Sequence, residues 1–123
     1  MFNSKVSFAM PVRILVLAAF IVAAVQFPAL AGRQDFVFVN NSGKVVTELR
    51  FSPSQNSSFE GNVLSSPIYH GESRTIRVNG YSDADRYWDF KVVTSNGTVW
   101  TWYGIDLLSV GRITVDGAGT AHY

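Results

Sequence analysis

The sequence predicts a small all-β sandwich, immunoglobulin-like in outline, that follows a signal peptide. Residues 32–123 contain 15 Val and Ile but only four Leu and three Ala, and β-branched side chains favour strands. Short apolar or alternating runs are separated by turn residues, and no helical period appears after the leader. Runs of this kind, spaced about 8–12 residues apart, are typical of an antiparallel sandwich, here with about seven strands.

Residues 1–31 have the pattern of a signal peptide. Lys5 and Arg13 are the only charges, residues 14–25 are an unbroken run of 12 apolar residues, and Ala29 and Ala31 give a small-x-small cleavage signature. A membrane span needs about 20 residues, so the run fits a secretory leader better. We expect cleavage after Ala31, a periplasmic or secreted chain without stable membrane insertion, and one β-sandwich domain over residues 32–123. An uncleaved anchor is the alternative.

The first two strands follow from short-range patterns. Asp35–Asn40 (DFVFVN) is apolar on both faces, which predicts a central strand, and Asn41–Gly43 predicts a turn. Lys44–Ser52 alternates, which predicts a strand with one buried face. Its two faces are expected to hold Val45, Leu49 and Phe51 on one side and Val46, Glu48 and Arg50 on the other.

The middle and the end of the chain are less regular. Pro53–Ser58 (PSQNSS) reads as a polar loop, and Phe59–Leu64 fits neither a strand nor a loop clearly. Ser73–Val78 alternates weakly, with Ile76 and Val78 expected to face inward. Arg112–Val115 predicts a last strand before a Gly-rich tail.

The clearest local signal is a hairpin made of Tyr87–Ser95 and Thr98–Tyr103. Asn96 and Gly97 between them are the preferred residues of a two-residue type I′ turn, in which both residues need positive φ. With such a turn, Ser95 lies opposite Thr98, Val93 opposite Trp100, and Lys91 opposite Trp102.

This register assigns residues to faces, because opposed side chains share a face. The more apolar face is predicted to lie in the core, and it holds Trp88, Phe90, Val92, Val99, Thr101 and Tyr103. The outward face is predicted to hold Asp89, Lys91, Val93, Trp100 and Trp102. A slip of one residue would exchange the two faces.

The outward face supplies the candidate binding residues: Trp100, Trp102, Lys91 and Asp89. One interpretation is structural, with Lys91 lying across Trp102 in a cation–π contact of about 0.5–1 kcal/mol and a neighbouring loop covering Trp100. The other is an aromatic platform with a flanking charge pair, which would bind a protein or a glycan partner.

Composition excludes several classes. The chain has no Cys, which removes disulfides, zinc–thiolate sites and a cysteine nucleophile. Residues 32–123 carry eight basic and nine acidic side chains, so there is no basic footprint for nucleic acid. Ser82–Asp85 could present oxygens to calcium, but an EF-type loop is absent, and a solvated turn is the preferred interpretation. No motif indicates a cofactor, a metal site or a catalytic residue.

A resemblance rests on five segments in this order: Phe36–Gly43 (F-x-F-V-N-N-S-G), Leu49–Ser54 (L-R-F-S-P-S), Gly71–Ile76 (G-E-S-x-T-I), Trp88–Val92 (W-D-F-K-V) and residues 102–107 (W-x-x-x-D-L). Together they resemble a family of small exported bacterial β-sandwich proteins. The resemblance implies the same fold and brings no catalytic residue. Members of that family often carry a cysteine pair near the last strands, and this chain has none.

The sequence therefore predicts an exported, non-catalytic binding or interaction module. An alternative is a secreted inhibitor or toxin-neutralising protein that inserts a loop such as Pro53–Ser58 into a partner. A small hydrolase is the third class, and it would need a pocket that joins His70 to a carboxylate and a serine.

Overall fold

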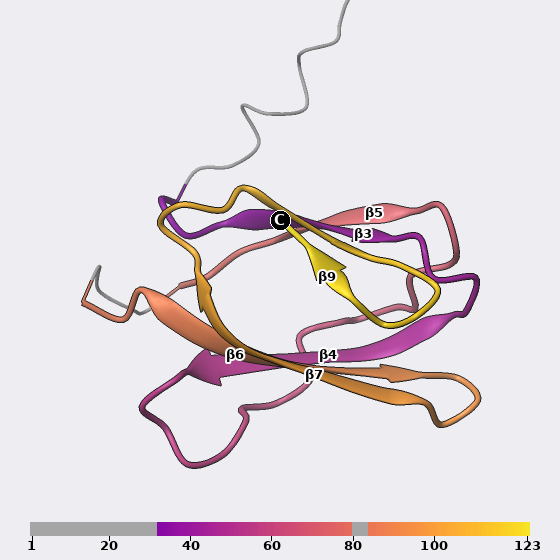
Figure 1. Cartoon of the computed structure of the whole chain (residues 1–123), viewed down its shortest axis with the longest axis horizontal. Helices are drawn as coiled ribbons and strands as arrows, with labels where there is room; N and C mark the ends of the chain where they lie inside the picture. Colours follow the sequence, from indigo (N-terminus) through magenta and orange to yellow (C-terminus); the bar gives the residue numbers. More distant parts are fainter. Residues whose placement is uncertain (1–31, 80–83) are drawn as a thin grey trace, which may run out of the picture. The chain divides into compact units, whose positions relative to one another are not determined.

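The computed structural model describes residues 32–79 and 84–123, and over these ranges the chain is a β-sandwich of seven strands. One sheet has the order β5-β3-β8-β9 and the other the order β4-β6-β7; Figure 1 shows β3 and β5 in one layer and β4, β6 and β7 in the other. The strand bounds are β3 Phe36–Asn40, β4 Val46–Pro53, β5 Ser73–Ile76, β6 Tyr87–Thr94, β7 Val99–Asp106, β8 Arg112–Val115 and β9 Ala121–His122. The all-β sandwich prediction is confirmed.

Parts of the sequence interpretation fall outside these residues. The leader and its cleavage site at Ala31 do so entirely, and the loop considered for calcium does so in part. Among the described residues, no helix is long and apolar enough to cross a membrane.

Strand pairing is antiparallel with one exception. β3 pairs in parallel with β8, Phe38 lying opposite Ile113, and antiparallel with β5 on its other side. β3 therefore lies inside its sheet, as its apolar composition predicts. The short strand β9 pairs with β8; the sequence analysis treated this stretch as part of a Gly-rich tail.

The core lies between the two sheets and is rich in aromatic rings. Phe36 meets Phe51 and Phe90 edge-on, with ring centroids 5.9 and 5.6 Å apart. Trp88 packs on Phe51 at 5.6 Å. All four side chains are buried, so this edge-to-face cluster holds the sheets together through a large apolar area.

Asn40 is a buried polar residue with all its hydrogen-bonding capacity used. Its Nδ2 donates to the carbonyls of Lys44 at 2.7 Å and Ile68 at 2.8 Å, and its Oδ1 accepts from the main-chain N–H and the hydroxyl of Ser42. Because a buried amide is costly without partners, this arrangement ties the turn after β3 to the chain that precedes β5.

A bulge in β4 corrects one predicted face. The register of β4 on β6 shifts between Val46 and Glu48, so Val46 lies in the core with Leu49 and Phe51. The expectation that Val46 lies on the face opposite Leu49 and Phe51 is wrong, because the extra residue of a bulge changes which side chains point inward.

Candidate functional site

The structure places the four predicted site residues on opposite faces of the hairpin. Phe90 lies opposite Trp102 and Val92 opposite Trp100, whereas Val93 lies opposite Val99. Trp100 and Trp102 therefore point inward, on the side of the buried Phe90, and Asp89 and Lys91 point outward. The predicted shared face, and with it the outward aromatic platform, is wrong.

The cause is one extra residue in the turn. Thr94 and Thr98 close the loop, with the Thr98 carbonyl accepting from the Thr94 N–H at 2.9 Å, so three residues lie between this closing pair. Gly97 has φ 88°, as the Asn-Gly signal requires. A three-residue loop whose αL glycine forms a bulge is the next most common hairpin connection, and the change of one residue exchanges the faces.

The other side of the hairpin follows the same shift. Val99 and Tyr103, expected in the core, are 50% and 71% exposed. Trp88, Phe90 and Val92 are buried as predicted, because these alternate residues are the more apolar set of β6 whichever residues of β7 lie opposite them.

Both tryptophans are covered by the turn between β8 and β9. Trp102 Nε1 donates to the Gly119 carbonyl at 2.8 Å, and its ring stacks on Phe38 at 6.4 Å. Gly119 is buried against the Trp100 indole. We call β7, β9 and this turn (residues 116–120) the closed flank, because both rings are structural there.

Hydrogen bonds within the turn hold the closed flank in place. The Asp116 carboxylate accepts from the main-chain N–H groups of Ala118 and Thr120 and contacts His122 Nε2 at 2.7 Å. The hydrogen bond with His122, followed by the one from Thr120, lowers the pKa of Asp116. The turn therefore gains stability from the ionised carboxylate.

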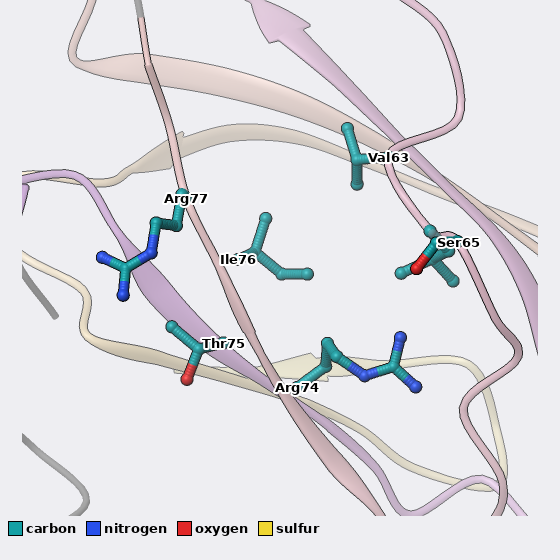
Figure 2. A pocket seen from close by; sticks show the side chains of 7 residues that line it. Val63, Ser65, Arg74, Thr75, Ile76 and Arg77 are labelled. Carbon is teal, nitrogen blue, oxygen red and sulfur yellow. The ribbon is translucent and has the colours of Figure 1, made fainter. Parts of the chain in front are cut away.

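The opposite side of the sandwich contains a groove. We call β5 and residues 62–68, which run beside β4, the open flank. The groove between them has a volume of about 290 Å³ and is lined by residues 63–65 and 74–77. Figure 2 shows Ile76 projecting toward Val63, with the Arg74 guanidinium on the side of Ser65 and the Arg77 guanidinium pointing away from Val63. The apolar floor of the groove is therefore bordered by the charge of Arg74.

The two arginines are held differently. The Arg74 guanidinium donates to the carbonyls of Ser66 at 3.2 Å and Pro67 at 3.0 Å, which carry no charge. Arg77 donates to the buried Asp35 carboxylate at 3.3 Å with its side chain 48% exposed. The charge of Arg74 is thus not matched by any carboxylate within the described residues.

The main chain of β5 is also available at this flank. The Asn40 N–H donates to the Glu72 carbonyl. In an antiparallel pair, alternate residues direct their main-chain N–H and C=O groups toward the neighbouring strand, so Arg74 and Ile76 also direct theirs toward β3. Ser73 and Thr75 turn theirs outward. In residues 32–79 and 84–123, no loop hydrogen bond reaches these outward groups, so β5 presents a free sheet edge beside the groove.

The edge of β4 on the same flank is covered. Val46 and Ile68 exchange two main-chain hydrogen bonds of 2.9 Å. The Val63 N–H donates to the Leu49 carbonyl, and the Leu49 N–H donates to the side-chain oxygen of Asn62. The stretch Phe59–Leu64, which the sequence left ambiguous, forms no strand; part of it seals this edge.

The histidines and charged pairs serve the fold. His70 Nδ1 accepts from Gly43 N–H at 2.9 Å, and among the described residues no group of three metal-ligating side chains exists. Arg86 forms an ion pair with Asp106; this hydrogen bond lowers the pKa of Asp106 and raises that of Arg86. Ser109 and Leu108 also donate to Asp106, which anchors the turn after β7.

Sequence reasoning missed the groove. The segment Arg74–Arg77 shows two arginines around Ile76, but nothing local indicates that β5 is an edge strand or that residues 63–65 lie opposite it. Those facts depend on strand order, which long-range packing sets.

No protein-family model and no curated protein matches the chain. A solved structure, described as the NMR structure of the protein from Eubacterium rectale, is similar over 71% of this chain and 82% of its own, with 12% sequence identity and a TM-score of 0.49.

Proposed function

We propose that residues 32–123 form an exported, non-catalytic interaction module that binds an extended acidic segment of a partner protein at the edge of β5. The observation that carries this proposal is the free main-chain edge at Ser73 and Thr75 beside a groove of about 290 Å³. Addition of a strand to such an edge gains affinity from main-chain hydrogen bonds and specificity from alternate side chains.

Charge complementarity selects the partner. A strand added beside β5 would direct alternate side chains into the groove, next to Arg74, and the others to the outer face, next to Arg77. Arg74 has only neutral carbonyl partners, and a guanidinium bonds a carboxylate more strongly than a neutral acceptor. An acidic residue that the added strand directs into the groove therefore has a favourable place beside Arg74.

The contrast with β4 supports the same site. Both β4 and β5 are edge strands of their sheets, yet residues 62–68 protect only β4. Exposed edges invite pairing with another chain. Export is proposed from the leader pattern alone, and a binding role outside the cell agrees with it.

The decisive variant is Thr75→Pro. Proline removes the outward N–H of Thr75, which the β3 ladder does not use, and edge strands tolerate proline at such positions. Thr75→Val is the matched control, because it keeps the N–H and the branched side chain. Both proteins are expressed from the full-length sequence and compared by thermal unfolding.

The probe is a phage-displayed random peptide library. We expect the wild-type protein and Thr75→Val to enrich acidic peptides, whose affinity, measured by fluorescence anisotropy, falls about tenfold for Thr75→Pro, the cost of a lost hydrogen bond. Arg74→Gln should weaken the acidic peptides selectively. If Thr75→Pro unfolds, alternate N-methylation of an enriched peptide tests the same hydrogen bonds.

Two results would overturn the proposal. One is the absence of any enriched peptide. The other is enrichment of peptides that bind Thr75→Pro as well as wild type but lose binding when Pro53–Ser58 is replaced by Gly and Ser, a result that would favour the loop-inserting inhibitor.

A further inference from the structure

A second, smaller hollow lies at the C-terminal end of β4, and no residue of β5 lines it. It has a volume of about 180 Å³ and lies where the loop after β4 meets the outer face of β6 and β7. Figure 1 shows this loop extending from the end of β4. Its lining includes Asn56, Ser57, Ser58, Phe59, Asp89 and Tyr103.

Asp89 is held so that one carboxylate oxygen remains free. Its Oδ1 accepts from the Ser54 hydroxyl at 2.7 Å and from the Gly104 N–H at 2.9 Å. Its Oδ2 accepts no hydrogen bond from any residue in the described part of the chain. Asp89 lines the hollow, and a carboxylate that two donors orient through one oxygen can accept a hydrogen bond from a ligand with the other.

A β-bulge sets the position of Tyr103. Trp88 lies opposite Ile105 and Phe90 opposite Trp102, so Tyr103 and Gly104 together face Asp89. Gly104 has φ 69°, which this bulge requires and a side chain would resist. Tyr103 is 71% exposed, and with Phe59 it supplies aromatic surface to an otherwise polar hollow.

The polar groups of the loop add both donors and acceptors. The side-chain amide of Asn56 and the hydroxyls of Ser57 and Ser58 make no hydrogen bond within the described residues, and all three side chains are exposed. An amide donates and accepts, and so does a hydroxyl. The hollow thus combines an acceptor-only carboxylate, three versatile groups and two aromatic rings.

We propose that this hollow binds one neutral sugar ring. Sugar hydroxyls donate to a carboxylate and exchange hydrogen bonds with amides and hydroxyls, while the C–H face of the ring packs on an aromatic side chain. The Asp89 charge disfavours phosphorylated or carboxylated ligands. The volume is below the roughly 300–1,000 Å³ of sites for drug-sized molecules, so one ring occupies it and the rest of a glycan lies outside.

The test is an NMR titration of the protein, expressed from the full-length sequence, with the methyl glycosides of glucose, galactose, mannose and N-acetylglucosamine. At least one should shift the amide signals of the loop and of Gly104, with a dissociation constant near the millimolar range. No amide shift with any of the four glycosides at tens of millimolar would overturn the proposal.

Two variants identify the site. Asp89→Asn keeps an oxygen for Ser54 and Gly104 but replaces the free Oδ2 with a donor, and it should weaken binding about tenfold. Tyr103→Ala should weaken binding similarly, whereas Tyr123→Ala, which removes a ring that is 68% exposed elsewhere, should leave it unchanged. Equal affinity in all variants would place the sugar outside this hollow and overturn the assignment.

This site is independent of the β5 edge. Thr75→Pro should bind the same glycoside as wild type, because neither Thr75 nor the groove beside it lines the hollow. Loss of sugar binding in Thr75→Pro, with the fold intact, would contradict the separation of the two sites.

Discussion

The closed and open flanks of the sandwich differ in how completely other segments of the chain cover them. On the closed flank, the turn between β8 and β9 folds over Trp100 and Trp102 and hydrogen-bonds one of them. On the open flank, residues 62–68 seal β4 but leave the edge of β5 and a groove of about 290 Å³. Aromatic residues thus stabilise one flank, and cationic residues border the cavity on the other.

The difference shows that residue type alone does not identify a binding surface. Two closely spaced tryptophans beside charges suggest a recognition platform, yet here they are part of the packing. Arg74 and Ile76 suggest an ordinary strand, yet they border the larger of the two hollows described above. What distinguishes the two regions is whether a later segment of the chain covers them.

The largest expected effect would break the closed flank. Trp102→Ala should lower the free energy of unfolding by about 3–5 kcal/mol, because it removes a ring packed on Phe38 and Phe90 and leaves a cavity. Urea denaturation measures the change. The neighbouring Tyr103→Ala is the control, and its effect should stay within about 0.5 kcal/mol. Equal effects of the two variants would mean that the rings do not differ in packing.

The second variant tests how the turn fits the tryptophans. Gly119→Ala should lower the free energy of unfolding by about 2–4 kcal/mol, because φ at Gly119 is 83° and an added Cβ would overlap the Trp100 indole. Gly43→Ala is a matched control: Gly43 has φ 79° but nothing within 4 Å of an added Cβ. The difference between the losses of unfolding free energy in the two variants measures the cost of the overlap with Trp100. A zero difference would show that the turn does not press on Trp100.

A smaller effect is expected on the open flank. Arg74→Ala removes two hydrogen bonds to the carbonyls of Ser66 and Pro67 and should destabilise the chain by about 0.5–1.5 kcal/mol. The same denaturation experiment applies. A loss as large as that of Trp102→Ala would mean that the open flank is as structural as the closed one, which would weaken its assignment as a binding edge.

The smallest effect concerns pH and the turn of the closed flank. The pKa of Asp116 is lowered mainly by its hydrogen bond with His122. A depressed pKa adds stability that is complete above the ordinary aspartate pKa of about 3.9 and is lost as the pH falls through the folded value. The melting temperatures of the wild type and Asp116→Asn should therefore begin to converge as the pH falls below about 4 and continue to do so through the lower folded-state pKa. A constant difference between pH 6 and pH 3 would contradict the contribution of the ionised carboxylate.

Particular residues show how far the sequence predicts this molecule. Phe36–Asn40, Tyr87–Thr94 and Arg112–Val115 were identified as strands with nearly correct bounds, and Trp88, Phe90 and Val92 were assigned to the core. The alternation of a buried strand is a local property, so it is readable without the fold. Of the four candidate site residues, Asp89 alone lines either of the two hollows described above, and it does so without the tryptophans.

By itself, the sequence determined the fold class, the positions of most strands and the positive φ of Gly97, because each follows from side-chain shape or backbone freedom within a few residues. The tertiary structure decided which face of β7 is buried, which edge is covered and where hollows remain. One extra turn residue at Thr94–Thr98 and the bulges at Val46 and Gly104 reverse faces without an evident local signal. The free edge of β5 and the groove beside it depend on contacts between segments far apart in the chain. These contacts are stable only when both sheets are packed together.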